Sequence, residues 1–228
     1  MSLAVRATAE ELMDADDLDP QVYAAVVGDL ARVNAVTLAA RPTLAFLNRV
    51  SLDGSRTLRL LDVGFGDGDM LRRIAGWTAR RGIDAELVGV DLNSRSEPAA
   101  RAHTPAALPI RYLTGDYREV GGDWDVIVSS LVAHHMTHEQ LVDFLRFMDG
   151  NARNWFVNDL HRHGFAYRGY PLLAGLARWH PIVRHDGRLS IARSYRPAEW
   201  PPILAEAGVG NARVFRAFPF RLCVERLR

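Results

Sequence analysis

The stretch Leu61-Asp62-Val63-Gly64-Phe65-Gly66-Asp67-Gly68 decides the fold of this chain of 228 residues. It ends a short apolar run, residues 58–63, which is typical of a buried parallel strand. Residues 70–81 follow with apolar side chains at helical spacing, and Gly82 ends them. Glycine permits positive φ angles and close approach of the backbone to a ligand. The pattern therefore predicts a strand, a tight ligand-binding turn and a helix.

The same alternation of strand and helix continues on the C-terminal side of this turn. We expect strands at residues 86–91, 110–113, 125–128 and 154–157, and helices at 95–102 and 137–148. Short connections between alternating strands and helices predict a Rossmann-like, doubly wound α/β sheet. Such sheets bind their ligands at the carboxyl ends of the strands.

The two flanks of this region differ from it. Residues 1–19 are acidic and are expected to be frayed or loosely docked, whereas residues 20–50 read as a helix that Pro42 interrupts. Residues 160–196 are rich in His, Arg, Tyr and Gly and fit no simple repeat of strand and helix. A helix at 197–207 and a terminal hairpin at 214–224 complete the chain.

Composition excludes several classes of protein. Hydrophobic residues make up 48% of the chain and charged residues 24%, as in a globular domain. The net charge of +1 argues against a nucleic-acid partner, which would require an excess of basic residues. Every basic residue is Arg, so no Lys can act as nucleophile or base. Cys223 is the single cysteine and reads as a core residue.

No secretory signal and no membrane span is expected from the sequence. The N-terminal residues are acidic where a signal peptide would be basic, and no stretch approaches the ~20 apolar residues of a span. We therefore expect a cytoplasmic protein without a membrane partner.

The acids around the glycine turn favour a cationic ligand. A dinucleotide fingerprint reads Gly-x-Gly-x-x-Gly, but Asp69 stands where its third glycine belongs. A pyrophosphate would also meet Asp62 and Asp67, whereas a sulfonium ligand with an ammonium group would be attracted by them. An oxidoreductase that uses NAD stays the alternative.

Two further acids follow the next strands. Asp91 can accept hydrogen bonds from ribose hydroxyls, and Asp116 can accept one from an adenine amino group. Tyr117 or Leu92 would pack on the adenine ring. Each acid alone could merely cap a helix, but acids at three successive strand ends favour a shared ligand.

Residues 62–68, 90–92, 115–116 and 124–130 resemble the class I S-adenosylmethionine (SAM)-dependent methyltransferases. The resemblance implies a seven-stranded, mostly parallel sheet with an antiparallel terminal hairpin and a helical cap. It also implies residues 1–50 as an N-terminal helical cap and residues 51–228 as the SAM-binding domain, with 160–196 as a cap or substrate segment. The implied cofactor-binding residues are Asp62, Gly64, Phe65, Gly66, Gly68, Asp91, Leu92, Asp116, Tyr117, Ser129 and Ser130.

Residues 29–34, 157–160 and 184–190 are similar to a bacterial subgroup of small-molecule methyltransferases that is associated with the methylation of quinones or polyketides. That likeness implies a small-molecule acceptor of phenolic, quinol or polyketide type, methylated on oxygen or carbon. A monomer or homodimer is expected. A non-catalytic module with this fold is a further alternative.

Histidines are the candidate bases for an oxygen or carbon nucleophile. His134 and His161 are the favoured catalytic residues because each follows a strand at the edge where the ligand is expected. His135, His163 and His185 are the other candidates. A zinc site at residues 159–163 would need further ligands elsewhere, so no metal is expected. An anion clamp formed by Arg184, Arg188, Arg193 and Arg196 competes with their placement as solvated surface groups.

Overall fold

The computed structural model describes residues 3–15, 17–51 and 57–228, and its seven strands form one sheet. The strands are β1 (Leu58–Val63), β2 (Ala85–Asp91), β3 (Ile110–Thr114), β4 (Trp124–Ser130), β5 (Ala152–Leu160), β6 (Arg213–Ala217) and β7 (Arg221–Arg226). Their order is β3-β2-β1-β4-β5-β7-β6. The first five strands run parallel, and β7 runs antiparallel to both of its neighbours. The predicted mostly parallel sheet with a terminal antiparallel hairpin is confirmed.

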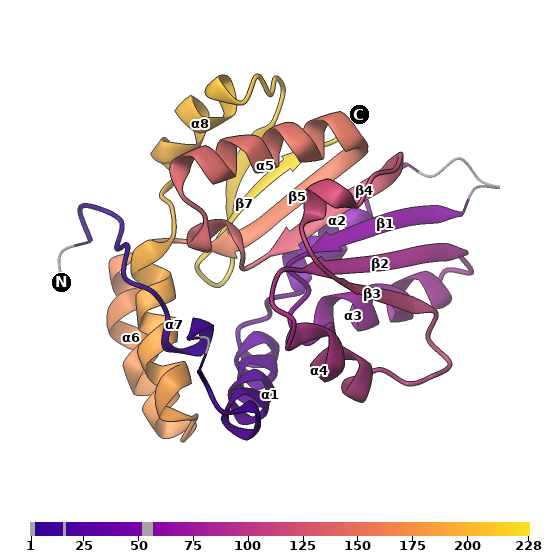
Figure 1. Ribbon diagram of the computed structural model, residues 1–228. Helices are drawn as coiled ribbons and strands as arrows, with labels where there is room; N and C mark the ends of the chain where they lie inside the picture. Colours follow the sequence, from indigo (N-terminus) through magenta and orange to yellow (C-terminus); the bar gives the residue numbers. More distant parts are fainter. Residues whose placement is uncertain (1–2, 16, 52–56) are drawn as a thin grey trace.

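Helices cover both faces of the sheet (Figure 1). One face packs against α5 (His138–Asn151) and α8 (Trp200–Glu206), and this core contains Leu61, Trp155 and Val224. The other face packs against α2 (Arg41–Leu47), α3 (Asp69–Ala79) and α4 (Ser96–His103), and its core contains Leu60 and Cys223. Neighbouring residues of a strand point to opposite faces, so apolar runs such as 58–63 supply both cores.

Three helices stand together beyond the carboxyl ends of the parallel strands (Figure 1). They are α1 (Pro20–Val36), α6 (Gly164–Leu176) and α7 (Pro181–Arg193), and α7 contacts both α1 and α6. Asp19 caps α1 by accepting from the backbone N–H groups of Gln21 and Val22, as expected for a residue before a helix-starting proline. The two helices within residues 160–196 were not predicted.

The N-terminal segment, residues 3–15, is docked, so the prediction of a loosely docked start is wrong for these residues. Glu11 is 5% exposed, and the Ser190 hydroxyl of α7 donates to it. Arg6 donates to the backbone carbonyls of Arg193 and His134. Backbone N–H groups of Leu12 and Met13 donate to Asp186. Residues 1, 2 and 16, which the same prediction included, lie outside the described residues.

Within the described ranges, no single helix has the length and apolarity to cross a membrane. The segments 21–36 and 41–47 reach that length and composition only as a pair, which is bent by 64°.

Gly89 of β2 lies where the sheet packs closely on α3, so a substitution there tests this packing. A Cβ atom there would lie 2.7 Å from both Leu71 Cδ1 and Phe65 Cδ1, which is closer than real Cβ contacts allow. We expect Gly89→Ala to lower the free energy of unfolding by about 1–3 kcal/mol, as overpacked cores do. Gly121→Ala is the matched control because its Cβ would meet no atom within 4 Å. Equal urea midpoints for the two variants would contradict the packing described.

Candidate functional site

The glycine turn after β1 has the conformation that its sequence predicts. Gly64, Gly66 and Gly68 have φ angles of 77°, 55° and 77°, which favour glycine. A Cβ atom at Gly64 would lie 2.3 Å from Val132 Cγ2, and one at Gly68 would lie 2.5 Å from the Tyr112 hydroxyl oxygen. A Cβ at Gly66 would meet nothing within 4 Å. The first and third glycines therefore serve packing, and the middle one leaves open space beside the turn.

Asp62 is a buried carboxylate without a partner in the described structure. Its side chain is on β1 directly before the turn, is 1% exposed, and neither oxygen accepts a hydrogen bond from any described group. Burial, reinforced by the negative charge of Asp91, raises the pKa of Asp62 to about 8. A small cavity of about 50 Å³ adjoins it, lined also by Asn34, Gly64 and Ser130. A cationic ligand group placed there would supply the missing interaction.

Asp91 ends β2 and is tied to the same turn. Its Oδ2 accepts from the backbone N–H of Gly66 and its Oδ1 from that of Asn93, each at 2.9 Å. Burial raises the pKa of Asp91 against the effect of these two N–H donors. Leu92 beside it is 74% exposed, which leaves its side chain open to a ligand. A carboxylate has further lone pairs, so Asp91 can still accept from a ribose hydroxyl.

Asp116 and Tyr117 lie further along the same edge. Asp116 accepts from the backbone N–H of Arg118 and forms an ion pair with the guanidinium of that residue, and these hydrogen bonds lower its pKa. The Tyr117 ring packs edge-on against Phe144 and Phe147. The structure therefore gives both residues local roles, and binding of adenine by them stays a prediction.

The two serines at the end of β4, Ser129 and Ser130, lie in different environments. The Ser129 hydroxyl donates to the Val63 carbonyl at 2.9 Å inside the sheet, and Ser129 lines neither the small cavity at Asp62 nor a larger one beside it. Ser130 lines both the small cavity at Asp62 and a larger one. Ser130 thus has the position expected of a residue next to a bound ligand.

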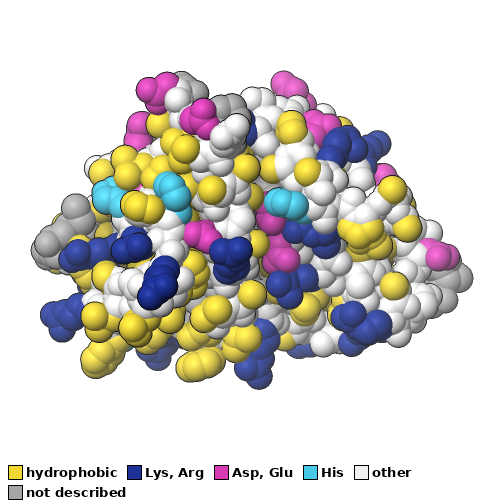
Figure 2. Space-filling model, turned by 90° about the horizontal axis from the view of Figure 1, so that it is seen from below, with side chains coloured by type: hydrophobic (Ala, Val, Ile, Leu, Met, Phe, Trp, Pro, Cys, Tyr) yellow, Lys and Arg dark blue, Asp and Glu magenta, His cyan; other side chains and the backbone are white. Residues whose placement is uncertain are grey.

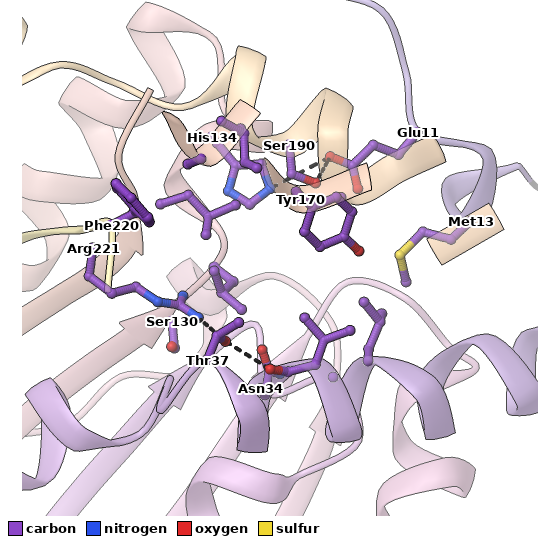
Figure 3. Close-up of a pocket in the computed structure, with 18 of the residues that line it drawn as sticks. Glu11, Met13, Asn34, Thr37, Ser130, His134, Tyr170, Ser190, Phe220 and Arg221 are labelled. Carbon is purple, nitrogen blue, oxygen red and sulfur yellow. Dashed lines mark hydrogen bonds and ion pairs between the residues drawn. The ribbon is translucent and has the colours of Figure 1, made fainter. Parts of the chain in front are cut away.

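The larger cavity, of about 450 Å³, lies between the sheet edge and the three helices beyond it (Figure 3). Its walls come from α1, the glycine turn, the end of β4, the N-terminal segment, α6, α7 and the turn before β7. Most of the lining is apolar and includes Val27, Leu30, Leu131, Leu160, Phe165, Leu173 and Phe220. Figure 2 shows this side of the molecule from below, with hydrophobic side chains and arginines interspersed. A cavity of this size and lining suits a small apolar molecule.

A chain of buried ionic groups forms one wall of this cavity. Asp159 at the end of β5 accepts from the backbone N–H of His134 at 2.8 Å and contacts its ring Nδ1 at 2.7 Å. Nε2 of His134 lies 3.6 Å from Glu11 Oε1. Burial disfavours the imidazolium, but Asp159 and Glu11 together raise the pKa of His134 to about 9. His134, one of the two predicted bases, therefore lines the cavity as a cation at neutral pH.

His161, the other predicted base, does not line the cavity. Its backbone N–H donates to the Phe220 carbonyl, and its ring lies 5.2 Å from that of His163. Burial lowers the pKa of His161, and the neighbouring His163, Arg216, Arg196 and Arg162 lower it further. The geometry gives His161 no contact with a ligand, although its strand ends at the expected edge.

The histidine-rich segment forms no metal cluster at residues 159–163, because Asp159 is bound to His134 instead. Glu11, His134 and His135 do offer three possible metal ligand atoms within 4.8 Å of one another. Their mutual ion pairs account for this grouping, since His135 also pairs with Asp14.

The arginines at 184, 188, 193 and 196 do not line the cavity as a clamp; Arg184, Arg188 and Arg196 are exposed, as the favoured interpretation predicts, whereas Arg193 is buried. Arg193 donates to the carbonyls of Ala9, His134 and His135, and Arg184 donates to that of Trp179. Arg196 donates to Leu3, and Arg188 lies over the Tyr167 ring. These arginines hold segments of the protein together.

Arg221 is the arginine that reaches the cavity, and the sequence reasoning missed it (Figure 3). It lies inside the expected terminal hairpin, in an otherwise apolar run. Nothing in that pattern signals a buried cation.

Residues 60–150 match the family model described as a methyltransferase domain. No curated protein matches the sequence significantly. The chain is similar in structure to magnesium protoporphyrin IX methyltransferase from Synechocystis PCC 6803 with bound S-adenosylhomocysteine (SAH). That pair has a TM-score of 0.58 and 18% identity over 95% of this chain and 90% of the other.

Two further structural neighbours have the same fold. The plantazolicin methyltransferase BpumL in complex with SAH has a TM-score of 0.64 and 14% identity, covering 93% of this chain and 92% of its own. The CMeT domain of the citrinin polyketide synthase has a TM-score of 0.59 and 15% identity, covering 82% of this chain and 52% of the other. The predicted fold is confirmed, and the family match over residues 60–150 is to a methyltransferase domain.

The raised pKa of Asp62 gives a pH-dependent penalty that a substitution can remove. Its carboxyl ionises near pH 3.8 when unfolded and near pH 8 when folded, so the penalty grows as pH rises between these values. We expect Asp62→Asn to raise the free energy of unfolding by several kcal/mol at pH 8 and to leave it nearly unchanged near pH 4. Urea unfolding across this range measures it, with Asp123→Asn as an exposed control. A variant less stable than the wild type at pH 8 would refute the unpaired carboxylate.

The pair of His134 and Asp159 predicts a further loss of stability at alkaline pH. The folded pKa of His134, about 9, exceeds its ordinary value of 6.5, so its stabilisation is complete below pH 6.5 and is lost as pH rises through 9. We expect the destabilisation caused by His134→Asn to shrink steadily over that interval. His138→Asn is the control, because His138 pairs with Glu206 on the surface and contributes little. A pH-independent loss would exclude the imidazolium.

Proposed function

We propose that this chain, whose residues 60–150 form a methyltransferase domain on a class I SAM-dependent methyltransferase fold, transfers a methyl group from SAM to a small apolar acceptor. The observation that carries the proposal is the unpartnered Asp62 carboxylate at a glycine turn that opens onto the larger cavity. A buried acid without a donor is costly unless a ligand supplies one.

The residues of the site fit the parts of SAM. Asp62 would bind its amino group, and the 64–68 turn would enclose its methionine part with Gly66 facing it. Asp91 would accept from the ribose hydroxyls, with Leu92, Asp116 and Tyr117 around the adenine. SAM supplies a methyl group that its sulfonium has already activated. The protein has to align the acceptor with that methyl group and exclude water.

The acceptor would occupy the larger cavity above Ser130. Its apolar lining and the Tyr170, Phe165 and Phe220 rings suit a phenol, a quinol or a polyketide-like compound. The structural neighbours include a magnesium protoporphyrin IX methyltransferase and a polyketide synthase CMeT domain, which supports a small-molecule acceptor. Both oxygen and carbon acceptors fit this cavity.

We propose His134 as a charged hydrogen-bond donor and positioning residue, in place of a base. An imidazolium cannot take a proton, and the pKa of about 9 keeps His134 protonated at neutral pH. Its contacts with Asp159 and Glu11 hold the N-terminal segment against the cavity. We propose no catalytic role for His161.

An NAD-dependent reaction is disfavoured by two observations. A pyrophosphate at the glycine turn would offer Asp62 no hydrogen-bond donor and would disfavour its ionised form, so the buried acid would stay without a partner. Beyond β5 the sheet also continues with the antiparallel β7, whereas the dinucleotide fold continues with a parallel sixth strand. We further propose a cytoplasmic monomer or homodimer, and the even charge balance supports the absence of a nucleic-acid partner.

Calorimetric titration with SAH tests the cofactor site. We expect binding accompanied by proton release at pH 7, because ionised Asp62 would bind the ammonium group of SAH. Repeating the titration in buffers of different ionisation enthalpy measures the released protons. Asp62→Asn should weaken binding at least tenfold and abolish the release, whereas Asp123→Asn should change neither.

No binding of SAH or SAM by the wild type at millimolar concentration would refute the proposed function. Tight binding of NADH instead would support the oxidoreductase. Transfer of a radiolabelled methyl group from SAM into a panel of phenols and quinols then tests for catalysis, which a non-catalytic module would lack.

A further inference from the structure

Arg221, the first residue of β7, is a buried cation with unsatisfied donors. Its side chain is 1% exposed, and neither Nε nor Nη1 has a hydrogen-bond partner among the described residues. Nη2 donates to the Thr37 hydroxyl at 3.1 Å. Burial lowers the pKa of the guanidinium to about 10, which leaves it charged at neutral pH. Such a group costs several kcal/mol unless an anion or a set of acceptors compensates it.

The acidic side chains around the large cavity have partners other than Arg221. Glu11 accepts from Ser190 and faces His134, Asp14 pairs with His135, and Asp67 pairs with Arg72. Asp159 attracts Arg221 from a distance, but its oxygens accept from His134 and from the backbone of Leu160. Among the charged side chains described at this cavity, Arg221 alone has nitrogen atoms without any partner.

Arg221 lies in the wall of the cavity, and its guanidinium is buried there beside the Thr37 hydroxyl. Figure 3 shows it extending from the end of β7 toward Thr37 and Ser130, with Phe220 beside it. The surrounding wall is largely apolar, so an anion placed there would meet one strong partner in a medium of low polarity. The planar set of N–H donors in a guanidinium suits a carboxylate or another anionic oxygen.

We propose that Arg221 binds an anionic oxygen of the methyl acceptor, a carboxylate or a phenolate carried by an otherwise apolar molecule. The inference rests on the proposed function and narrows its substrate class. A neutral acceptor would leave Arg221 uncompensated in the complex, whereas an acidic acceptor would satisfy it. Arg221 is thus a specificity-determining residue for acidic acceptors.

The carboxylate of SAM is too far away to be this anion. In the sheet register, Asp62 of β1 lies level with Val128 of β4, Phe156 of β5 and Glu225 of β7. Three strand spacings therefore separate Asp62 from β7. Arg221 is four residues beyond Glu225, so the backbones of Asp62 and Arg221 are about 19 Å apart by strand geometry. Arg221 also lines only the large cavity, and Asp62 only the small one.

Matched pairs of acids and amides test the proposal on SAH-saturated protein. Calorimetry at pH 7.5 compares benzoate with benzamide, 2-naphthoate with 2-naphthamide, and octanoate with octanamide. We expect the wild type to bind at least one acid ten or more times more tightly than its amide. Arg221→Gln and Arg221→Met should abolish this preference and leave SAH binding unchanged. Arg216→Gln, on the exposed side of β6, should keep it.

Both Arg221 variants should also melt at or above the wild-type temperature, because each removes an uncompensated buried charge. Unfolding of both variants would assign Arg221 a structural role and overturn the proposal. So would a wild type that binds SAH but prefers none of the acids. Weakened SAH binding with an intact acid preference would overturn it as well. Failure of the wild type to bind SAH would instead refute the proposed function.

Discussion

The buried pair between Asp159 and His134 is the interaction on which the architecture of the site depends. Asp159 ends β5, while His134 lies in the short 3-10 turn after β4, so their contact joins two neighbouring strand ends. His134 in turn faces Glu11, to which Ser190 of α7 donates. One ionic chain therefore connects the sheet to the N-terminal segment and to α7. Without it, a buried acid would remain in the wall without its counter-charge.

This chain also explains why a cavity persists beyond the sheet. The apolar faces of α1, α6 and α7 would gain by closing on one another, as the small core around Val26, Trp179 and Val183 shows. The N-terminal segment and α7 are instead held by directional contacts at defined positions, including those of Arg6 and Arg193 with the backbone near His134. Fixed polar contacts around an apolar space keep that space open for a ligand.

Much of the sheet could be predicted because its signals are local. The apolar run at 58–63 and the glycines after it define β1 and the turn, and Thr137 with Gln140 forms the capping box that starts α5. The helices within 160–196 were missed because Pro171 lies inside α6 and glycines interrupt its pattern. Their stability comes from packing on each other and on α1, which a single segment does not reveal.

The candidate site likewise combines residues that local sequence predicts with residues that only the folded structure reveals. Asp62 could be predicted as a ligand-binding residue because it lies directly before the glycine turn in the sequence. Its lack of a hydrogen-bond partner could not be predicted, because that depends on the folded protein. Glu11 was expected in a loose segment because Ser190, its partner, is 179 residues away in the sequence. Arg221 was missed for a similar reason: a basic residue in a strand is ordinarily at the surface, and only the assembled cavity makes it buried and unpaired.

Asp62 and Arg221 are two buried groups, one a carboxyl and one a cation, whose atoms without partners the proposed ligands would satisfy. Stability and occupancy are then linked by mass action: a ligand at a hundred times its dissociation constant adds about 2.7 kcal/mol to the folded state. The folded fraction, and with it the resistance of the chain to proteases, would follow the supply of ligand. The lifetime of this protein in a cell would therefore report on the metabolites available to it.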